Sequence, residues 1–167
     1  MKIGKKILLL LLILLVGIQF FHPEKNQTTA VPVNDIGKLY AIPDDVKIIL
    51  AKACNDCHTN NTVYPWYNNI QPIAWWLNNH VVDGKRNFNF DEFATYRVAK
   101  QYKRMQQCIN LVKKNEMPLD SYTWIHKNAI LTDAEKETFF KWCNAVRDSI
   151  KAKYPADSLI IPNKKRS

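Results

Sequence analysis

The chain has 167 residues and is strongly basic, with 24 lysines and arginines, 15 acidic residues and a net charge of +9. This length accommodates one domain with a hydrophobic core and little more. Beyond residue 21 the only glycines are Gly37 and Gly84. No glycine-rich phosphate loop can be built from them, so a nucleotide cofactor is excluded.

Residues 1–21 have the pattern of an export signal. Lys2, Lys5 and Lys6 precede an apolar run over residues 7–21. As a helix, this run of about 15 residues would measure about 22 Å, less than the ~30 Å hydrocarbon core of a bilayer. No small-residue cleavage site adjoins it, so we expect an uncleaved anchor on the periplasmic face of the inner membrane. Cleavage, which would release a periplasmic protein, stays open.

The remainder divides into three segments. Residues 22–39 are polar and contain two prolines, which indicates a tether between membrane and domain. Residues 40–152 are expected to form the domain, and residues 153–167 a basic C-terminal tail.

The domain is predicted to be all-α, with about four helices, because apolar residues recur at helical spacing and no alternating strand pattern competes. The first helix begins after Pro43 and leads into residues 54–58. The second begins after Pro72 and stops near Gly84.

Two capping-box patterns mark the later helices. Asn89 with Glu92 predicts a third helix that runs toward Asn115, and Thr132 with Glu135 predicts the last. In chain order, the residues expected to face inward are Val46, Ile49, Leu50 and Ala53; Ile73, Trp76, Leu77, His80 and Val81; Met105, Cys108, Ile109 and Val112; and Phe139, Trp142, Cys143, Val146 and Ile150.

Residues 54–58 have the pattern Cys-x-x-Cys-His, which accepts a covalently attached c-type haem. Within one helical turn Cys54, Cys57 and His58 share a face. Two sulfurs could then hold the porphyrin edge while the imidazole reaches the iron as proximal ligand. The second ring nitrogen of His58 would need a hydrogen-bond acceptor. Export fits this hypothesis, because haem c is attached outside the cytoplasm.

Two other kinds of site use a similar pair of cysteines. A structural zinc ion needs four ligands, and no second Cys-x-x-Cys or His-x-x-x-His accompanies residues 54–58. A thioredoxin-like dithiol would begin a helix within a βαβ pattern, and no strands are indicated. Covalent haem, with iron as the metal, is therefore the preferred hypothesis.

A second axial ligand would decide what the iron can do. Met117 is the candidate, because Pro118 ends the preceding helix and Met/His ligation suits electron transfer. Met117 could instead fill a gap in the core. His80 is the rival ligand, unless it is a core histidine bonded to a carbonyl group. His126 is expected near the surface.

Two further cysteines and several aromatic side chains leave alternatives open. Cys108 and Cys143 lie on inward helix faces, where they would either form a disulfide in an oxidising compartment or remain buried thiols. Trp66 and Trp76 would either line a haem pocket or pack in the core.

A helix leading into Cys-x-x-Cys-His, a methionine before proline and a closing amphipathic helix resemble a class I cytochrome c. More closely, about residues 43–150 resemble the small bacterial haem-binding domain family built around one Cys-x-x-Cys-His. Besides residues 54–58, the resemblance rests on Tyr64-Pro65-Trp66-Tyr67, Trp75-Trp76-Leu77, His80-Val81 and Glu116-Met117-Pro118. It implies a cytochrome c-like fold around covalent haem and adds little about the reaction.

Together these features predict a membrane-tethered periplasmic monohaem c-type cytochrome, an electron carrier rather than a catalyst. Cys54, Cys57, His58 and Met117 would hold its haem. An open distal position would instead permit a haem-based peroxidase or a gas or redox sensor, and a zinc-stapled interaction domain is a further alternative. The basic surface would attract an acidic redox partner or anionic lipid, and no nucleic-acid partner is expected.

Overall fold

The computed structural model describes residues 3–161, and within that range the chain is helical and contains no strand. Its α-helices are α1 (Ile3–Ile18), α2 (Asp44–Ala53), α3 (Asn55–His58), α4 (Ile73–Asn87), α5 (Val98–Lys113), α6 (Asp120–Thr123) and α7 (Asp133–Lys153). The short 3₁₀ turns are η1 (Ile36–Lys38), η2 (Trp66–Asn69), η3 (Phe90–Thr95), η4 (Lys127–Ala129) and η5 (Ala156–Leu159). The all-α prediction is confirmed for these residues, although the domain divides into more helices than the four expected.

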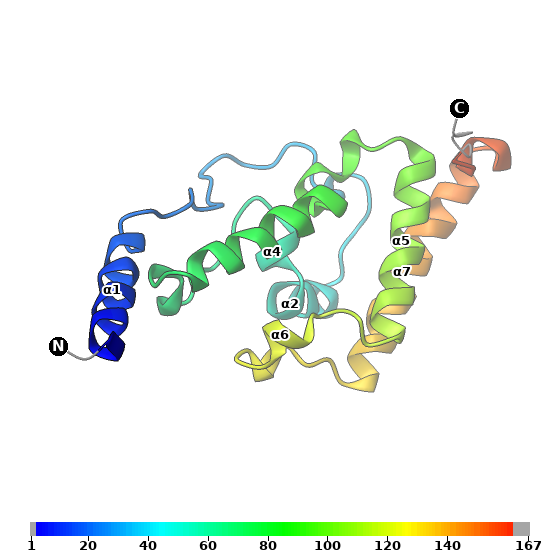
Figure 1. The fold of residues 1–167 in the computed structure, drawn as a ribbon. Coiled ribbons are helices and arrows are strands. Elements are labelled where there is room, and N and C mark those ends of the chain that lie inside the picture. The colour runs from blue at the N-terminus through cyan, green and yellow to red at the C-terminus, as the bar shows by residue number, and fades with distance from the viewer. Residues whose placement is uncertain (1–2, 162–167) are drawn as a thin grey trace, which may run out of the picture.

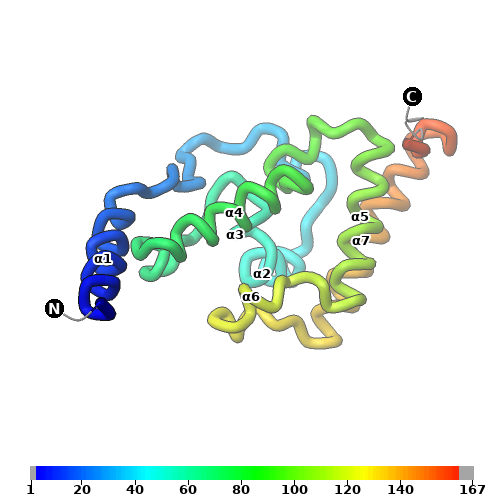
Figure 2. Tube along the Cα trace, viewed as in Figure 1, coloured from blue at the N-terminus to red at the C-terminus, as the bar shows by residue number. Residues whose placement is uncertain are grey.

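Two helix pairs organise the domain. α5 and α7 lie side by side, and α4 lies against the short helix α3 (Figures 1 and 2). α2 contacts both pairs, through α7 on one side and α3 on the other. The Cys-x-x-Cys-His segment in α3 is therefore held between a core-forming part of the domain and α4.

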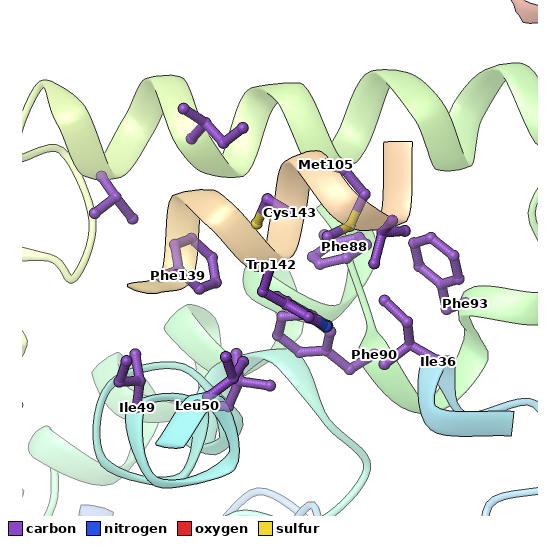
Figure 3. Close-up of a cluster of buried hydrophobic side chains, with 14 of the residues drawn as sticks. Ile36, Ile49, Leu50, Phe88, Phe90, Phe93, Met105, Phe139, Trp142 and Cys143 are labelled. Carbon is purple, nitrogen blue, oxygen red and sulfur yellow. The ribbon is translucent and has the colours of Figure 1, made fainter. Parts of the chain in front are cut away.

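The hydrophobic core forms where α7 meets α5 and α2 (Figure 3). The five residues of α7 predicted to face inward are all buried: Phe139, Trp142, Cys143, Val146 and Ile150. The other two helices contribute Val46, Ile49, Leu50, Met105, Ile109 and Val112. The indole N–H of Trp142 donates to the Ala41 carbonyl at 3.1 Å, so this large core side chain also has its polar atom satisfied.

The third predicted helix is in fact two elements. The predicted capping box is not formed, because the Asn89 side chain accepts from the N–H of Asp91 and starts the 3₁₀ turn η3. The Glu92 carboxylate accepts from the Asn60 side chain instead. α5 begins only at Val98. The prediction is wrong here because a tertiary contact recruits the acid that the spacing assigned to a helix cap.

α4 begins after Pro72 as predicted but continues past Gly84 to Asn87. Its predicted inward face is wrong at Ile73 and Trp76, which are 38% and 42% exposed. The helix turns Gly84 toward α3 instead, so the glycine that resembled a helix end serves as a point of close packing.

α7 begins with the predicted capping box. The Thr132 side chain accepts from the N–H of Glu135, and the Glu135 carboxylate accepts from the N–H of Thr132. Lys52 of α2 donates to the same carboxylate at 2.5 Å. One acid therefore caps α7 and ties it to α2.

No helix within residues 3–161 is long and apolar enough to cross a membrane, α1 having 16 residues. The N-terminal anchor stays a prediction.

The segment expected to be a tether, residues 22–39, lies against the domain (Figure 1). The Asn26 amide donates at 2.9 Å to the carbonyl of Thr59 and to the hydroxyl of Thr62. Ile36 is fully buried in the core. These contacts make the segment a part of the folded structure. Of the predicted C-terminal tail, residues 162–167 lie outside the described range.

Candidate functional site

A cavity of about 690 Å³ lies between α3, α4, α5 and the segment that follows α5. Its volume falls within the range of about 300–1,000 Å³ that suits small-molecule and cofactor sites. The four site residues proposed from the sequence all line it: Cys54, Cys57, His58 and Met117. Apolar side chains supply much of the remaining wall, among them Phe88, Phe90, Leu111, Leu131 and Phe139.

Cys54 and Cys57 are brought to the cavity by a tight turn. α2 ends at Ala53, and the carbonyl of the next residue, Cys54, accepts from the N–H groups of Cys57 and His58. Burial, reinforced by neighbouring ionisable groups, raises the pKa of Cys54 to about 12 and the pKa of Cys57 to about 11. Both sulfurs are therefore neutral thiols on the cavity wall.

The imidazole of His58 is oriented by a backbone group. Its Nδ1 lies 2.8 Å from the carbonyl oxygen of Phe88. A carbonyl can only accept, so Nδ1 carries the proton and Nε2 keeps its lone pair. Burial lowers the pKa of His58, while hydrogen bonds to the carbonyls of Phe88 and Gly84 oppose that effect. The ring is thus held in the tautomer that a metal ligand requires.

Gly84 allows α4 to lie directly on α3, within the Cys-x-x-Cys-His segment. A Cβ atom at this position would lie 3.0 Å from Cys57 Cβ and closer still to the Cys57 carbonyl oxygen. Real Cβ atoms do not approach backbone atoms so closely, and only glycine fits. This contact brings the last turns of α4, and the Phe88 carbonyl that follows them, against His58.

Met117 reaches the cavity from a loop beyond α5. Asn115, with φ 57°, lies in the left-handed region just past the helix end, which favours asparagine among the non-glycine residues. The N–H groups of Glu116 and Met117 both donate to the carbonyl of Leu111, which closes the last turn. Met117 is partly buried and packs against the core as well as lining the cavity.

A polar link joins the Met117 loop to the Cys-x-x-Cys-His segment. The Tyr122 hydroxyl donates to the Asp56 carboxylate at 2.7 Å, and both residues line the cavity. Burial, and then the hydrogen bond to Asp56, raise the pKa of Tyr122 far above its usual value. The His126 ring stacks on Tyr122 at 4.3 Å, and its Nε2 lies 2.9 Å from the Tyr67 hydroxyl. His126 therefore supports the loop from behind the cavity wall.

The remaining candidates are placed as follows. His80 lines the cavity, and its Nδ1 lies 2.8 Å from the Trp76 carbonyl oxygen. Trp66 and Trp76 are absent from the cavity wall within the described residues, and Trp66 is 76% exposed.

Cys108 and Cys143 are thiols in the structure. Cys108 lines the cavity, whereas Cys143 is buried in the core. Burial raises the pKa of each, to about 12 for Cys108.

Sequence reasoning missed three features of this site. The Phe88 carbonyl leaves no trace in sequence, because every residue has a carbonyl group. The bond between Asp56 and Tyr122 joins residues far apart in the chain. Gly84 left a signal, since it is a lone glycine within an amphipathic helical pattern.

Comparison with known proteins shows which family the chain belongs to. Residues 13–145 match the model of a family described as a haem-binding domain. The chain belongs to this haem-binding domain family. No curated protein and no solved structure matches it.

The cavity of this haem-binding domain fits its cofactor. It combines apolar walls, two thiols on one turn, an imidazole with a fixed tautomer and a thioether from a separate segment. No three His, Cys, Asp or Glu side chains in the part of the chain that the structure describes are grouped to hold a bare metal ion.

Proposed function

We propose that this haem-binding domain is a monohaem c-type cytochrome, similar to class I cytochromes c, that transfers single electrons. Cys54 and Cys57 would form thioether bonds to the porphyrin, and His58 and Met117 would be the axial iron ligands. The observation that carries the proposal is the anchored His58 ring on the same cavity wall as two thiols. Haem ligated in this way supplies reversible one-electron oxidation and reduction.

The protein groups have separate tasks in this proposal. The Phe88 carbonyl accepts a hydrogen bond from Nδ1 of His58, which leaves Nε2 as the ligand atom. Met117 approaches from a different segment and would supply the second iron ligand, so no ligand position would remain for a substrate. Apolar wall residues exclude water from the cofactor, which favours a carrier over a catalyst.

We also propose that the chain is exported to the periplasm with residues 1–21 as its signal, because haem c is attached there. Without Lys2, Lys5 and Lys6 the exported part carries a net charge of +6, which favours an acidic redox partner, since charge complementarity accelerates encounter.

Mass spectrometry of the denatured protein tests covalent attachment. The chain would be expressed with and without a cytochrome c maturation system, as wild type, as Cys54→Ser/Cys57→Ser and as Cys108→Ser. We expect a haem-sized mass increment in the wild type and in Cys108→Ser, the matched cavity thiol, and only with maturation. The double variant should lose the increment completely. Wild-type protein that is exported and folded but never carries covalent haem would contradict the proposal. The same masses report whether residues 1–21 are removed.

A further inference from the structure

Arg104 is an unmatched positive charge on the wall of the haem cavity. Among the described residues that line the cavity, it is the only lysine or arginine. Its Nη1 donates to the neutral side chain of Gln107 at 2.8 Å. Within residues 3–161 it takes part in no ion pair.

The acids that line the same cavity are already engaged. Asp56 accepts from Tyr122 at 2.7 Å and from the N–H of Val63 at 3.0 Å. Asp83 pairs with Arg86 of the same helix at 2.5 Å. Neither carboxylate therefore serves as the counterion of Arg104.

The charge of Arg104 affects the pKa of two neighbouring side chains. Burial, and then the charge of Arg104, lower the pKa of Lys100. Burial raises the pKa of Cys108, on the cavity wall one turn along α5, and the charge of Arg104 opposes that rise. Because the charge of Arg104 influences these two groups, it would also stabilise an anionic part of a ligand.

We propose that Arg104 binds a propionate carboxylate of the haem. This inference rests on the proposed function for the presence of haem in the cavity. A guanidinium forms two parallel hydrogen bonds to a carboxylate, and a carboxylate taken from water without such a partner is costly. Arg104 also borders a surface hollow together with Lys103. The propionate edge of the haem therefore lies at this rim, where a carboxylate meets both the cation and solvent.

Porphyrin binding distinguishes loss of the contact between Arg104 and the propionate from other effects of substituting Arg104. The full chain with Cys54→Ala and Cys57→Ala would be titrated with haemin and with haemin dimethyl ester, whose propionates carry no charge. We expect the parent to prefer haemin by about tenfold or more, as one charge-assisted hydrogen bond allows. Arg104→Gln should abolish the preference, whereas Lys113→Gln, at an exposed cation of the same helix that lines neither the cavity nor the hollow, should retain it. An unchanged preference in Arg104→Gln would overturn the inference.

The covalent holoprotein provides a second measurement if the cysteine variants do not bind porphyrin. Arg104→Gln should lower the midpoint potential, because loss of a positive charge beside the haem favours the ferric state. It should also shift the pH dependence of that potential, as the propionate loses the cation that keeps it ionised. Arg104→Lys should restore both in part. A holoprotein of Arg104→Gln with wild-type potential at every pH would contradict the inference while leaving the cytochrome proposal intact.

Discussion

The two walls of the cavity proposed to hold haem are built from different kinds of contact. On one wall, backbone groups fix His58 and Cys57, through the Phe88 carbonyl at 2.8 Å and the close approach of Gly84. On the other, Met117 belongs to a loop tied to α3 by a side-chain hydrogen bond between Tyr122 and Asp56. Backbone contacts leave fewer alternative arrangements than side-chain contacts do. We therefore expect the His58 wall to tolerate little change and the Met117 wall to be adjustable.

Gly84→Ala tests the rigid wall and should have the largest effect. Alanine is the better helix former by about 1 kcal/mol, but its Cβ would collide with the backbone of Cys57. We expect a net loss of about 3 kcal/mol in the free energy of unfolding, because backbone atoms cannot move aside as side chains do. Urea unfolding measures this loss, and mass spectrometry measures the accompanying fall in covalent haem.

Val82→Ala is the matched control on the same helix. Val82 is 49% exposed, so its truncation should cost less than about 1 kcal/mol and leave haem attachment unchanged. Equal effects of the two substitutions would show that Gly84 has no special part in positioning α3.

Tyr122→Phe tests the adjustable wall. It removes the hydroxyl that bonds the Asp56 carboxylate, and should cost about 2 kcal/mol of unfolding free energy. We also expect weaker binding of Met117 to iron, seen as loss of the charge-transfer band of ferric Met/His haem at lower temperature than in the wild type. Tyr154→Phe, at a half-exposed tyrosine beyond α7, is the control. A Tyr122→Phe protein that keeps the band up to the wild-type temperature would argue against adjustability.

Glu135→Gln sharpens the comparison, because it weakens the fold through bonds to Thr132 and Lys52, neither of which lines the cavity. Glu135 caps α7 and pairs with Lys52, so the loss should be about 1 kcal/mol. The hydrogen bond from Lys52, followed by that from Thr132, lowers the pKa of Glu135. Its contribution is therefore complete above the unfolded pKa of about 4.5 and disappears as pH falls through the lower folded value.

Chemical denaturation at pH 7 and pH 3, with absorption spectra in parallel, measures the Glu135→Gln effect. The difference from wild type should shrink at pH 3, and the Met/His band should be unchanged. If Glu135→Gln released Met117 as readily as Tyr122→Phe, general stability rather than the Tyr122 bond would control the loop.

Local sequence patterns predicted the parts of the site that lie close together in the chain. Residues 54–58 bring two sulfurs and an imidazole to one cavity wall because a helical turn does so by itself. The capping box at Thr132 and the buried face of α7 followed from spacing in the same way. The proline after Met117 pointed to this residue as a cavity candidate, and Met117 does line the cavity. Its binding to iron stays a prediction.

Predictions from local sequence patterns were wrong or incomplete where contacts between distant segments determine the structure. Glu92 suited a helix cap but instead accepts from Asn60, and the predicted helix divides. The bond between Asp56 and Tyr122 depends on how the loop after α5 returns to α3, which no local spacing encodes. The Phe88 carbonyl became visible only when the end of α4 was placed beside His58.

Near-infrared magnetic circular dichroism of the ferric holoprotein tests the proposed cytochrome site most directly, because it distinguishes axial ligand pairs. We expect the low-spin signature of histidine and methionine ligation in the wild type, and its loss in Met117→Leu. A bis-histidine signature would assign the second position to another residue, with His80 on the cavity wall as the first to examine. A high-spin spectrum would mean an open iron position, and electron transfer would give way to peroxidase or sensor chemistry.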